Sequence, residues 1–112
     1  MSRITTHVLD TALGRPAAGV CVELQCEAAS NAWTALARAS TDAQGRVADF
    51  GAGPLRAANY RLRFDTGAYF AQTGRAAFFP TVEICFRVDA PTEHHHVPLL
   101  LSPFGYSTYR GS

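Results

Sequence analysis

Three consecutive histidines, His94, His95 and His96, stand near the carboxyl end of the sequence, directly before an apolar run at residues 97–101. If residues 94–101 form a strand, His94 and His96 project from one face and His95 from the other. Side chains two positions apart on a strand are separated by about 7 Å, which suits either a pair of bases or two metal ligands. Surface histidines without a chemical role fit the same spacing. Since a zinc site needs three or four ligands, the cluster alone leaves all these interpretations open.

Two further side chains that could take part in chemistry lie far from this cluster in the sequence. His7 belongs to a short alternating stretch at residues 4–9, and Arg46 follows the turn glycine of TDAQGR. Taken alone, each has an ordinary structural explanation, as a strand histidine and a solvated loop arginine. The sequence contains no motif of a nucleophile elbow, a Walker loop or a dinucleotide-binding loop.

The composition sets limits on the class of protein. The 112 residues carry a formal charge of +1 and are 47% hydrophobic, which fits a single domain over residues 1–112. The near-neutral charge predicts binding to neither nucleic acid nor an anionic membrane surface, and the apolar run 97–101 is too short to cross a bilayer. Three cysteines without CxxC spacing argue against a disulfide framework. Together with the absence of a long apolar leader, they predict a cytoplasmic protein with reduced thiols.

The elements that must position these side chains are mostly strands. Apolar and polar residues alternate over residues 20–27, 60–65 and 82–88, a pattern typical of strands with one face on a core. Turn residues separate these runs, and a further strand is expected near residues 33–39. Residues 66–74 are the exception and predict a short helix, capped by Thr66 and ended by Gly74. Seven or eight strands and one helix predict two packed sheets.

Four segments resemble one family from end to end. They are THVLDTALGRPAAGVCVEL at 6–24, TDAQGR at 41–46, FFPTVEICF at 78–86 and HHHVPLLLSPFGYSTYRGS at 94–112. These motifs are similar to those of the 5-hydroxyisourate hydrolases, the transthyretin-like enzymes of urate degradation. The terminal YRGS discriminates best, because hormone-carrying transthyretins lack it. The resemblance implies an all-β, transthyretin-like (prealbumin-like) β-sandwich of two four-stranded sheets with one short helix, assembled as a homotetramer.

The same resemblance implies an activity and a site. The activity is the hydrolysis of a cyclic amide, 5-hydroxyisourate, to 2-oxo-4-hydroxy-4-carboxy-5-ureidoimidazoline, with neither a metal nor an organic cofactor. The residues that match the family's active-site motifs are His7, Arg46, His96, Tyr109, Arg110, Gly111 and Ser112. His7, Arg46 and His96 are expected to be catalytic, and every member of the set except His96 to bind substrate. His95 replaces a tyrosine that the family often has, and we expect it to point away from His96.

These residue types suit the implied chemistry. A neutral imidazole can take a proton from water near neutral pH, and His7 and His96 are both candidates for that base. The planar guanidinium of Arg46 can hold an oxygen of the substrate and stabilise the charge that develops on it. We expect the α-carboxylate after Ser112 to orient an imidazole or to pair with an arginine. Two alternatives are a non-enzymatic carrier of a small hydrophobic ligand and a histidine-rich metal-binding domain.

Overall fold

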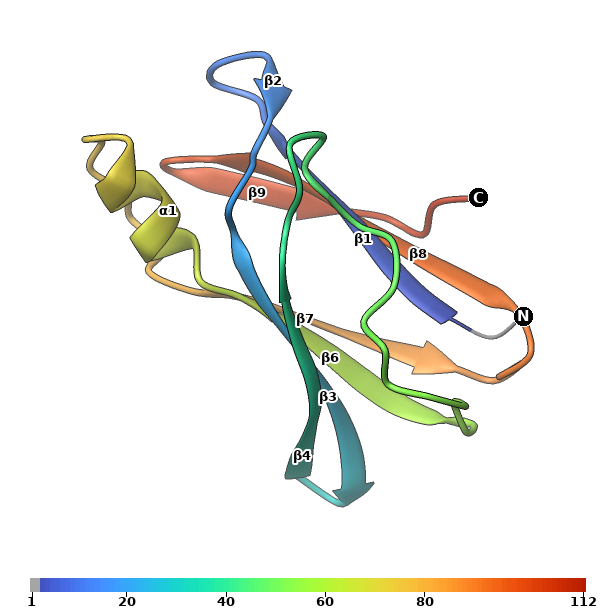
Figure 1. Cartoon of the computed structure of the whole chain (residues 1–112). Helices are drawn as coiled ribbons and strands as arrows, with labels where there is room; N and C mark the ends of the chain where they lie inside the picture. The colour runs from blue at the N-terminus through green and yellow to red at the C-terminus, as the bar shows by residue number, and fades with distance from the viewer. Residues whose placement is uncertain (1–2) are drawn as a thin grey trace.

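Alternating apolar residues build two β-sheets that pack face to face in the computed structural model, which describes residues 3–112 (Figure 1). The elements are β1 (Arg3–Asp10), β2 (Arg15–Pro16), β3 (Cys21–Ala29), β4 (Ala32–Ser40), β5 (Arg46–Val47), β6 (Ala58–Phe64), α1 (Thr66–Gln72), β7 (Val82–Val88), β8 (His94–Ser102) and β9 (Gly105–Thr108). One sheet has the order β2-β1-β8-β9, with β5 also paired to β1, and the other has the order β4-β3-β6-β7. The predicted sandwich with one short helix is therefore confirmed, and the two-residue β5 makes the first sheet five-stranded.

Both sheets contribute to the core between them. Val8 and Leu99 from the first sheet are completely buried, as are Val22, Leu62 and Phe64 from the second. All but Leu99 lie on the apolar side of an alternating strand, so the pattern read from the sequence corresponds to the inward face. Leu99 belongs to the continuous apolar run at residues 97–101. Burying such a side chain contributes about 1.5–3 kcal/mol, which holds the strands in a fixed register. The outward faces are thereby left to carry polar side chains.

A parallel pair of strands joins the two ends of the sequence. The strand β1 pairs with β8 from Arg3 opposite His94 to Asp10 opposite Leu101, and Thr5 lies opposite His96. Figure 1 shows the two strands side by side beneath the C-terminal segment. This register places the N-terminal polar residues of β1 beside the histidines of β8, although they are separated by about ninety positions in the chain.

The helix α1 starts in a different way from the sequence prediction. Its N-cap is Asp65, whose side chain accepts a hydrogen bond from the backbone N–H of Ala68 at 3.3 Å. Thr66 is the first helical residue, and its hydroxyl donates to the carbonyl oxygen of Phe79 instead. The prediction of Thr66 as the cap is therefore wrong, because the preceding aspartate, an equally strong capping residue, satisfies the free N–H group.

Within the described residues, no helix has the length and apolar character needed to span a membrane.

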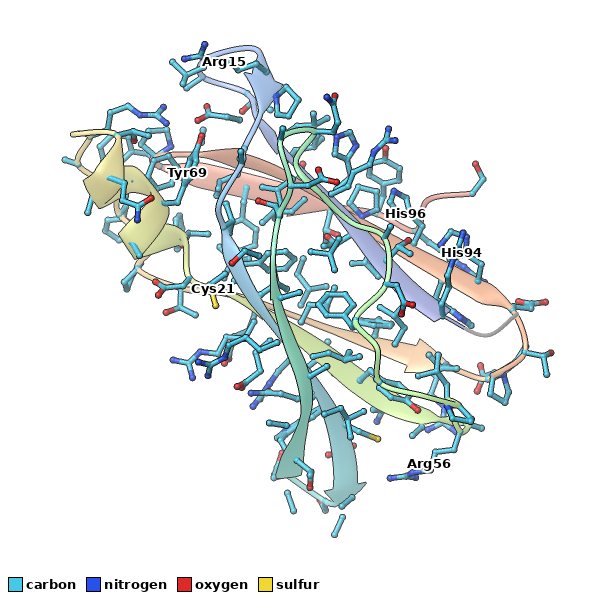
Figure 2. The ribbon with its side chains drawn as sticks, viewed as in Figure 1. Arg15, Cys21, Arg56, Tyr69, His94 and His96 are labelled. Atoms are coloured by element: carbon cyan, nitrogen blue, oxygen red, sulfur yellow. The ribbon has the colours of Figure 1, made fainter. Side chains whose placement is uncertain are left out.

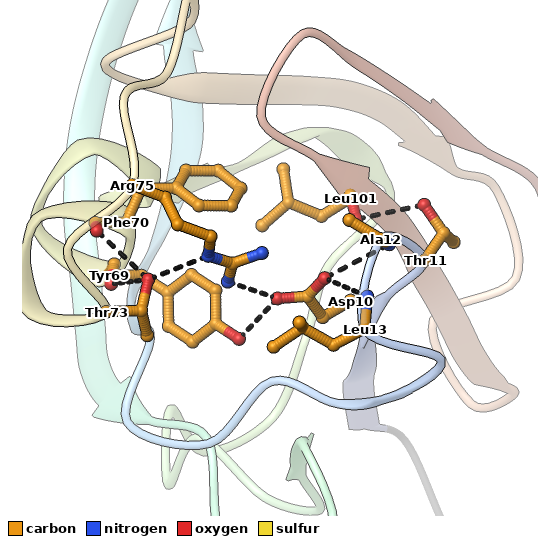
Figure 3. A network of polar contacts seen from close by, with 9 residues as sticks. All are labelled: Asp10, Thr11, Ala12, Leu13, Tyr69, Phe70, Thr73, Arg75 and Leu101. Carbon is orange, nitrogen blue, oxygen red and sulfur yellow. Dashed lines mark hydrogen bonds and ion pairs between the residues drawn. The ribbon is translucent and has the colours of Figure 1, made fainter.

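A buried carboxylate fastens α1 to the end of β1 (Figure 3). Asp10 is completely buried, and its Oδ2 accepts hydrogen bonds from Tyr69 at 2.7 Å and from Arg75 at 2.6 Å. Its Oδ1 accepts the backbone N–H groups of Ala12 and Leu13. Burial alone would raise the pKa of Asp10, but the hydrogen bonds from Arg75, Tyr69 and Leu13 outweigh it and leave the pKa below its ordinary value. The carboxylate therefore stays charged and links the helix to the first sheet.

Candidate active site

A pocket of about 260 Å³ opens on the outer face of the first sheet, where β1, β5 and β8 meet. The residues that line it include Arg3, Thr5, Arg46, His94, His96 and Ser112. They come from both ends of the chain and from the turn before β5, so the pocket exists only in the folded protein. Most of its lining residues have side chains that donate or accept hydrogen bonds, which suits a polar ligand.

The turn before β5 places Arg46 at the pocket. The side chain of Asp42 accepts the backbone N–H of Arg46 at 2.9 Å, and the N–H of Gly45 donates to the Asp42 carbonyl oxygen at 2.9 Å. Gly45 has φ +77°, and a Cβ at this position would collide with the carbonyl oxygen of Val8. The tight turn lets β5 pair with β1, so that Arg46 lies opposite His7. The glycine and aspartate of TDAQGR therefore explain how a loop arginine gains a fixed position.

His7 is oriented by the same turn. Its Nε2 lies 2.8 Å from the carbonyl oxygen of Gln44. Because a carbonyl oxygen only accepts hydrogen bonds, Nε2 must carry a proton, which leaves Nδ1 as the only ring nitrogen that could accept one. His7 stands opposite Arg46 in the β1–β5 pair but is not among the residues that line the pocket.

His96 occupies the interior of the pocket and is half-buried. Its Nδ1 lies 2.7 Å from the hydroxyl oxygen of Thr5. Burial lowers the pKa of His96, and the nearby charges of His94, His7 and Arg46 lower it further. The imidazole is therefore neutral near pH 7, which is the form that can accept a proton.

Gly111 lets the C-terminal segment pass directly over this imidazole. Its backbone N–H donates to the carbonyl oxygen of His96 at 2.8 Å. A Cβ at residue 111 would lie 2.5 Å from the His96 Cδ2 atom and 3.1 Å from its Cγ atom. Any side chain would therefore displace the ring or the segment. With glycine at this position, the next residue, Ser112, reaches the pocket.

In the single chain, Tyr109 and Arg110 lie outside the pocket that Arg46 and His96 line. They line a second pocket of about 240 Å³, together with residues of β7 and β8 that include His96. Tyr109 is 58% exposed, and Arg110 forms an ion pair with Glu93 at 3.3 Å. The structure thus brings His96 together with Arg46, Gly111 and Ser112, but it leaves Tyr109 and Arg110 on the other side of β8. Their predicted contact with substrate stays a prediction.

The three histidines of β8 divide as strand alternation predicts. His94 and His96 share a face, with ring centroids 6.0 Å apart, whereas His95 is only 5% exposed and lies on the core side of β8. The His95 Nδ1 atom lies 3.1 Å from the carbonyl oxygen of Glu93. In the part of the chain that the structure describes, no three His, Cys, Asp or Glu side chains are grouped to hold a metal ion.

Reasoning from sequence alone missed several lining residues, among them Arg3 and Thr5. Arg3 and Thr5 precede His7 at intervals of two, so they share its face of β1. That spacing is a usable signal, but threonine and arginine are common in strands and at their ends. Only the parallel pairing with β8 reveals that Thr5 lies opposite His96.

Comparisons with known proteins agree with this architecture. The family model described as "HIUase/Transthyretin family" matches residues 4–111. The 5-hydroxyisourate hydrolase of Mus musculus is 43% identical over 113 residues, which cover 99% of this chain and 96% of that protein. The solved structure of Klebsiella pneumoniae 5-hydroxyisourate hydrolase is 45% identical, with a TM-score of 0.87 and coverage of 99% of this chain and 100% of that chain.

A second solved structure represents the other branch of the family model. Sea bream transthyretin in complex with thyroxine has a TM-score of 0.90 at 31% identity, over 97% of this chain and 94% of that chain. The two-sheet sandwich, together with its match to both structures, defines a transthyretin-like protein. The chain belongs to the HIUase/Transthyretin family.

Proposed function

We propose that this protein is an enzyme that hydrolyses 5-hydroxyisourate to 2-oxo-4-hydroxy-4-carboxy-5-ureidoimidazoline in urate degradation. The observation that carries the proposal is the pairing of a neutral, half-buried His96 with Arg46 in one polar pocket. Full-length relatives with this activity, at 43–45% identity, support it. The substrate is a flat heterocycle rich in carbonyl and N–H groups, which matches a lining of arginine, histidine, threonine and serine.

The residues support a direct attack of water on a ring carbonyl. The water oxygen forms a bond with the carbonyl carbon while its proton passes to an imidazole. The negative charge that develops on the carbonyl oxygen is stabilised by the guanidinium of Arg46. The carbon–nitrogen bond of the ring then breaks, the leaving nitrogen takes the proton back from the imidazolium, and the new carboxyl group loses a proton to solvent. The ring opens without any change of oxidation state.

His96 is the better candidate for the base. Its Nδ1 is occupied by Thr5, and its Nε2 has no hydrogen-bond partner among residues 3–112. It lines the pocket together with Arg46, whereas His7 is not among the lining residues and donates to a backbone carbonyl. We assign the proton transfer to His96 Nε2, and to His7 the binding of substrate beside Arg46.

A carrier function is the alternative, since sea bream transthyretin in complex with thyroxine shares the fold. The pocket described above favours the enzyme, because two arginines and two histidines among its lining residues would lose hydration beneath a hydrophobic ligand. The tetrapeptide YRGS and the His7–Arg46 pair point in the same direction.

The remaining expectations concern the whole protein. We propose that residues 1–112 form one domain, that four copies assemble as a homotetramer, and that the protein works in the cytoplasm. One sandwich that includes elements from β1 to β9 supports the single domain. The free thiols of Cys21, Cys26 and Cys85 support a reducing compartment.

The decisive test follows the ultraviolet absorbance of freshly generated 5-hydroxyisourate with and without the protein. We expect the wild type to accelerate its decay. The variant His96→Asn should reduce turnover by about 10²-fold or more, because the proton acceptor is lost. The matched control His95→Asn changes the neighbouring histidine on the opposite face of β8. Circular dichroism checks that both variants are folded.

Three outcomes would count against this proposal. Decay at the uncatalysed rate in the presence of wild type would exclude the activity. An unchanged rate in His96→Asn would remove this histidine from the site. Loss of activity on chelation, together with stoichiometric zinc in the protein, would contradict the metal-free mechanism.

A further inference from the structure

A threonine hydroxyl joins two of the histidines at the pocket. The Oγ1 atom of Thr5 lies 2.6 Å from Nε2 of His94 and 2.7 Å from Nδ1 of His96. Thr5 is only 6% exposed, so water does not readily compete for these hydrogen bonds. Figure 2 shows His94 and His96 next to each other on β8. The contact follows from the parallel register that sets Thr5 opposite His96.

Counting protons limits what this hydroxyl can do. It has one hydrogen to donate and lone pairs with which to accept. If it donates to His96, Nδ1 of that ring is the acceptor, and the neutral ring carries its proton on Nε2. If it instead donates to His94 and accepts from His96, the proton of His96 is on Nδ1 and its Nε2 lone pair is free. Only the second arrangement lets His96 act as a base through Nε2.

We propose that Thr5 is a positioning residue that, with His94 as its acceptor, holds His96 in the Nδ1–H tautomer and so keeps Nε2 available to take a proton. The order of donation is from His96 Nδ1–H to Thr5 Oγ1, and from the Thr5 O–H to His94 Nε2. The consequence for catalysis rests on the proposed hydrolase function. The tautomer itself is a property of the free protein.

The same arrangement also serves the protonated ring. When His96 gains a proton at Nε2, its Nδ1–H still donates to Thr5. Neither hydrogen bond in the series from His96 through Thr5 to His94 therefore has to change direction. In the opposite arrangement the hydroxyl hydrogen would have to turn away from Nδ1 at every turnover. A preorganised acceptor avoids this rearrangement during the reaction.

The charged groups around the pocket make such an acceptor useful. Arg3 and His7 on β1, Arg46 on β5 and His94 on β8 all carry or can gain positive charge, and Ser112 lies at the open side. Burial, with the charge of Arg3, also lowers the pKa of His94, which keeps that ring neutral and able to accept from Thr5. The hydroxyl oxygen then stabilises the His96 imidazolium without adding another charge.

The test compares Thr5→Val, which removes the hydroxyl at nearly constant shape, with Thr5→Ser, which retains it. The control is Thr6→Val, because Thr6 is also buried and also lines the pocket, but its hydroxyl donates to the Val97 carbonyl oxygen and not to a histidine. Nitrogen-15 NMR of the imidazoles reports the tautomer of His96 without any substrate. Steady-state kinetics across pH separate kcat from KM.

We expect the Nδ1–H form of His96 in the wild type, in Thr5→Ser and in Thr6→Val, and a shift toward Nε2–H in Thr5→Val. The kcat of Thr5→Val should fall by about 10–100-fold, the range seen when a group that orients a metal-ligating histidine is lost, with KM changed far less. The acid limb of its pH profile should move, whereas that of Thr5→Ser should not.

Two results would overturn the proposal. One is an Nε2–H tautomer of His96 in the wild type, which needs no variant to fold. The other is an unchanged tautomer in Thr5→Val, or in His94→Phe if Thr5→Val does not fold, since that variant removes the acceptor of the hydroxyl. Failure of the proposed function is seen separately, as absence of turnover in the wild type whatever the tautomer.

Discussion

At the scale of single residues, the pocket depends on two glycines that leave room for neighbouring groups because they have no side chain. Gly111 has no Cβ, and this is what lets the C-terminal segment lie against the His96 ring. Gly45 is required for a similar reason, because its backbone passes close to Val8 in the turn that holds Arg46. Both glycines therefore control the position of a functional side chain that belongs to another residue.

Gly111→Ala should reduce turnover by about 10²-fold. The added methyl group would collide with the His96 Cδ2 atom, and a displacement of about 1 Å is enough for such a loss. Gly105→Ala is a matched control, since a Cβ there meets nothing closer than the Ser102 hydroxyl at 3.8 Å. The ultraviolet assay measures both variants. Equal activity of the two variants would contradict the steric need for glycine at position 111.

At the scale of elements, β1 has separate tasks at its two ends. Its N-terminal half places Thr5 in the pocket and His7 opposite Arg46, and its last residue, Asp10, binds Tyr69 and Arg75 from the helical region. The strand is thus fixed at one end by a buried ionic contact while the other end presents its polar face. In Figure 1 the helix lies at the opposite end of the sandwich from the C-terminus.

Arg75→Met should lower the free energy of unfolding by about 2–3 kcal/mol, because it leaves the buried Asp10 carboxylate without its charged partner. We expect less than the 3–5 kcal/mol typical of a fully buried pair, since the Arg75 side chain is 22% exposed and its Nη1 atom is buried without a partner among residues 3–112. The control Arg15→Met changes an exposed arginine. Urea denaturation at matched protein concentration compares the variants, and equal stability would show that the ion pair contributes nothing.

At the scale of the whole molecule, one chain leaves interaction surface open. The strands β7 and β9 end their sheets in the part of the chain that the structure describes, so each has an edge of unpaired backbone groups. Phe78, in the segment between α1 and β7, is 70% exposed, and Phe104, in the turn between β8 and β9, is 72% exposed. Such edges can pair with a strand of another chain, and burying exposed aromatic side chains removes apolar surface from water, so both favour association with further copies.

We therefore expect light scattering after size-exclusion chromatography to give a mass near four times that of the 12.1 kDa chain. Phe104→Glu should shift the distribution toward smaller species, because it places a charge on an exposed aromatic position. Arg15→Glu, at an exposed position in β2, serves as the control. A monomer at micromolar concentration in the wild type would contradict the proposed tetramer.

Local patterns in the sequence determined much of the architecture. Alternation at residues 82–88 predicted β7 with its observed bounds. The strand assumed at residues 94–101 matches β8 to within one residue, with His94 and His96 on one face and His95 on the other. The cap of α1 was misplaced by one position, because neighbouring Asp65 and Thr66 can both cap and only the path of the chain decides between them. These features depend on neighbours in the sequence, so they can be read from it.

Tertiary structure alone decided which side chains meet. Nothing local to Thr5 indicates that it would lie between His94 and His96, because that contact depends on a parallel pairing across almost the whole chain. The same holds for Tyr109, which a single chain places on the far side of β8 from Arg46. The sequence by itself determined the strands, their inward faces and the family. The register between distant strands decided the pocket, because backbone pairing fixes positions that no local pattern encodes.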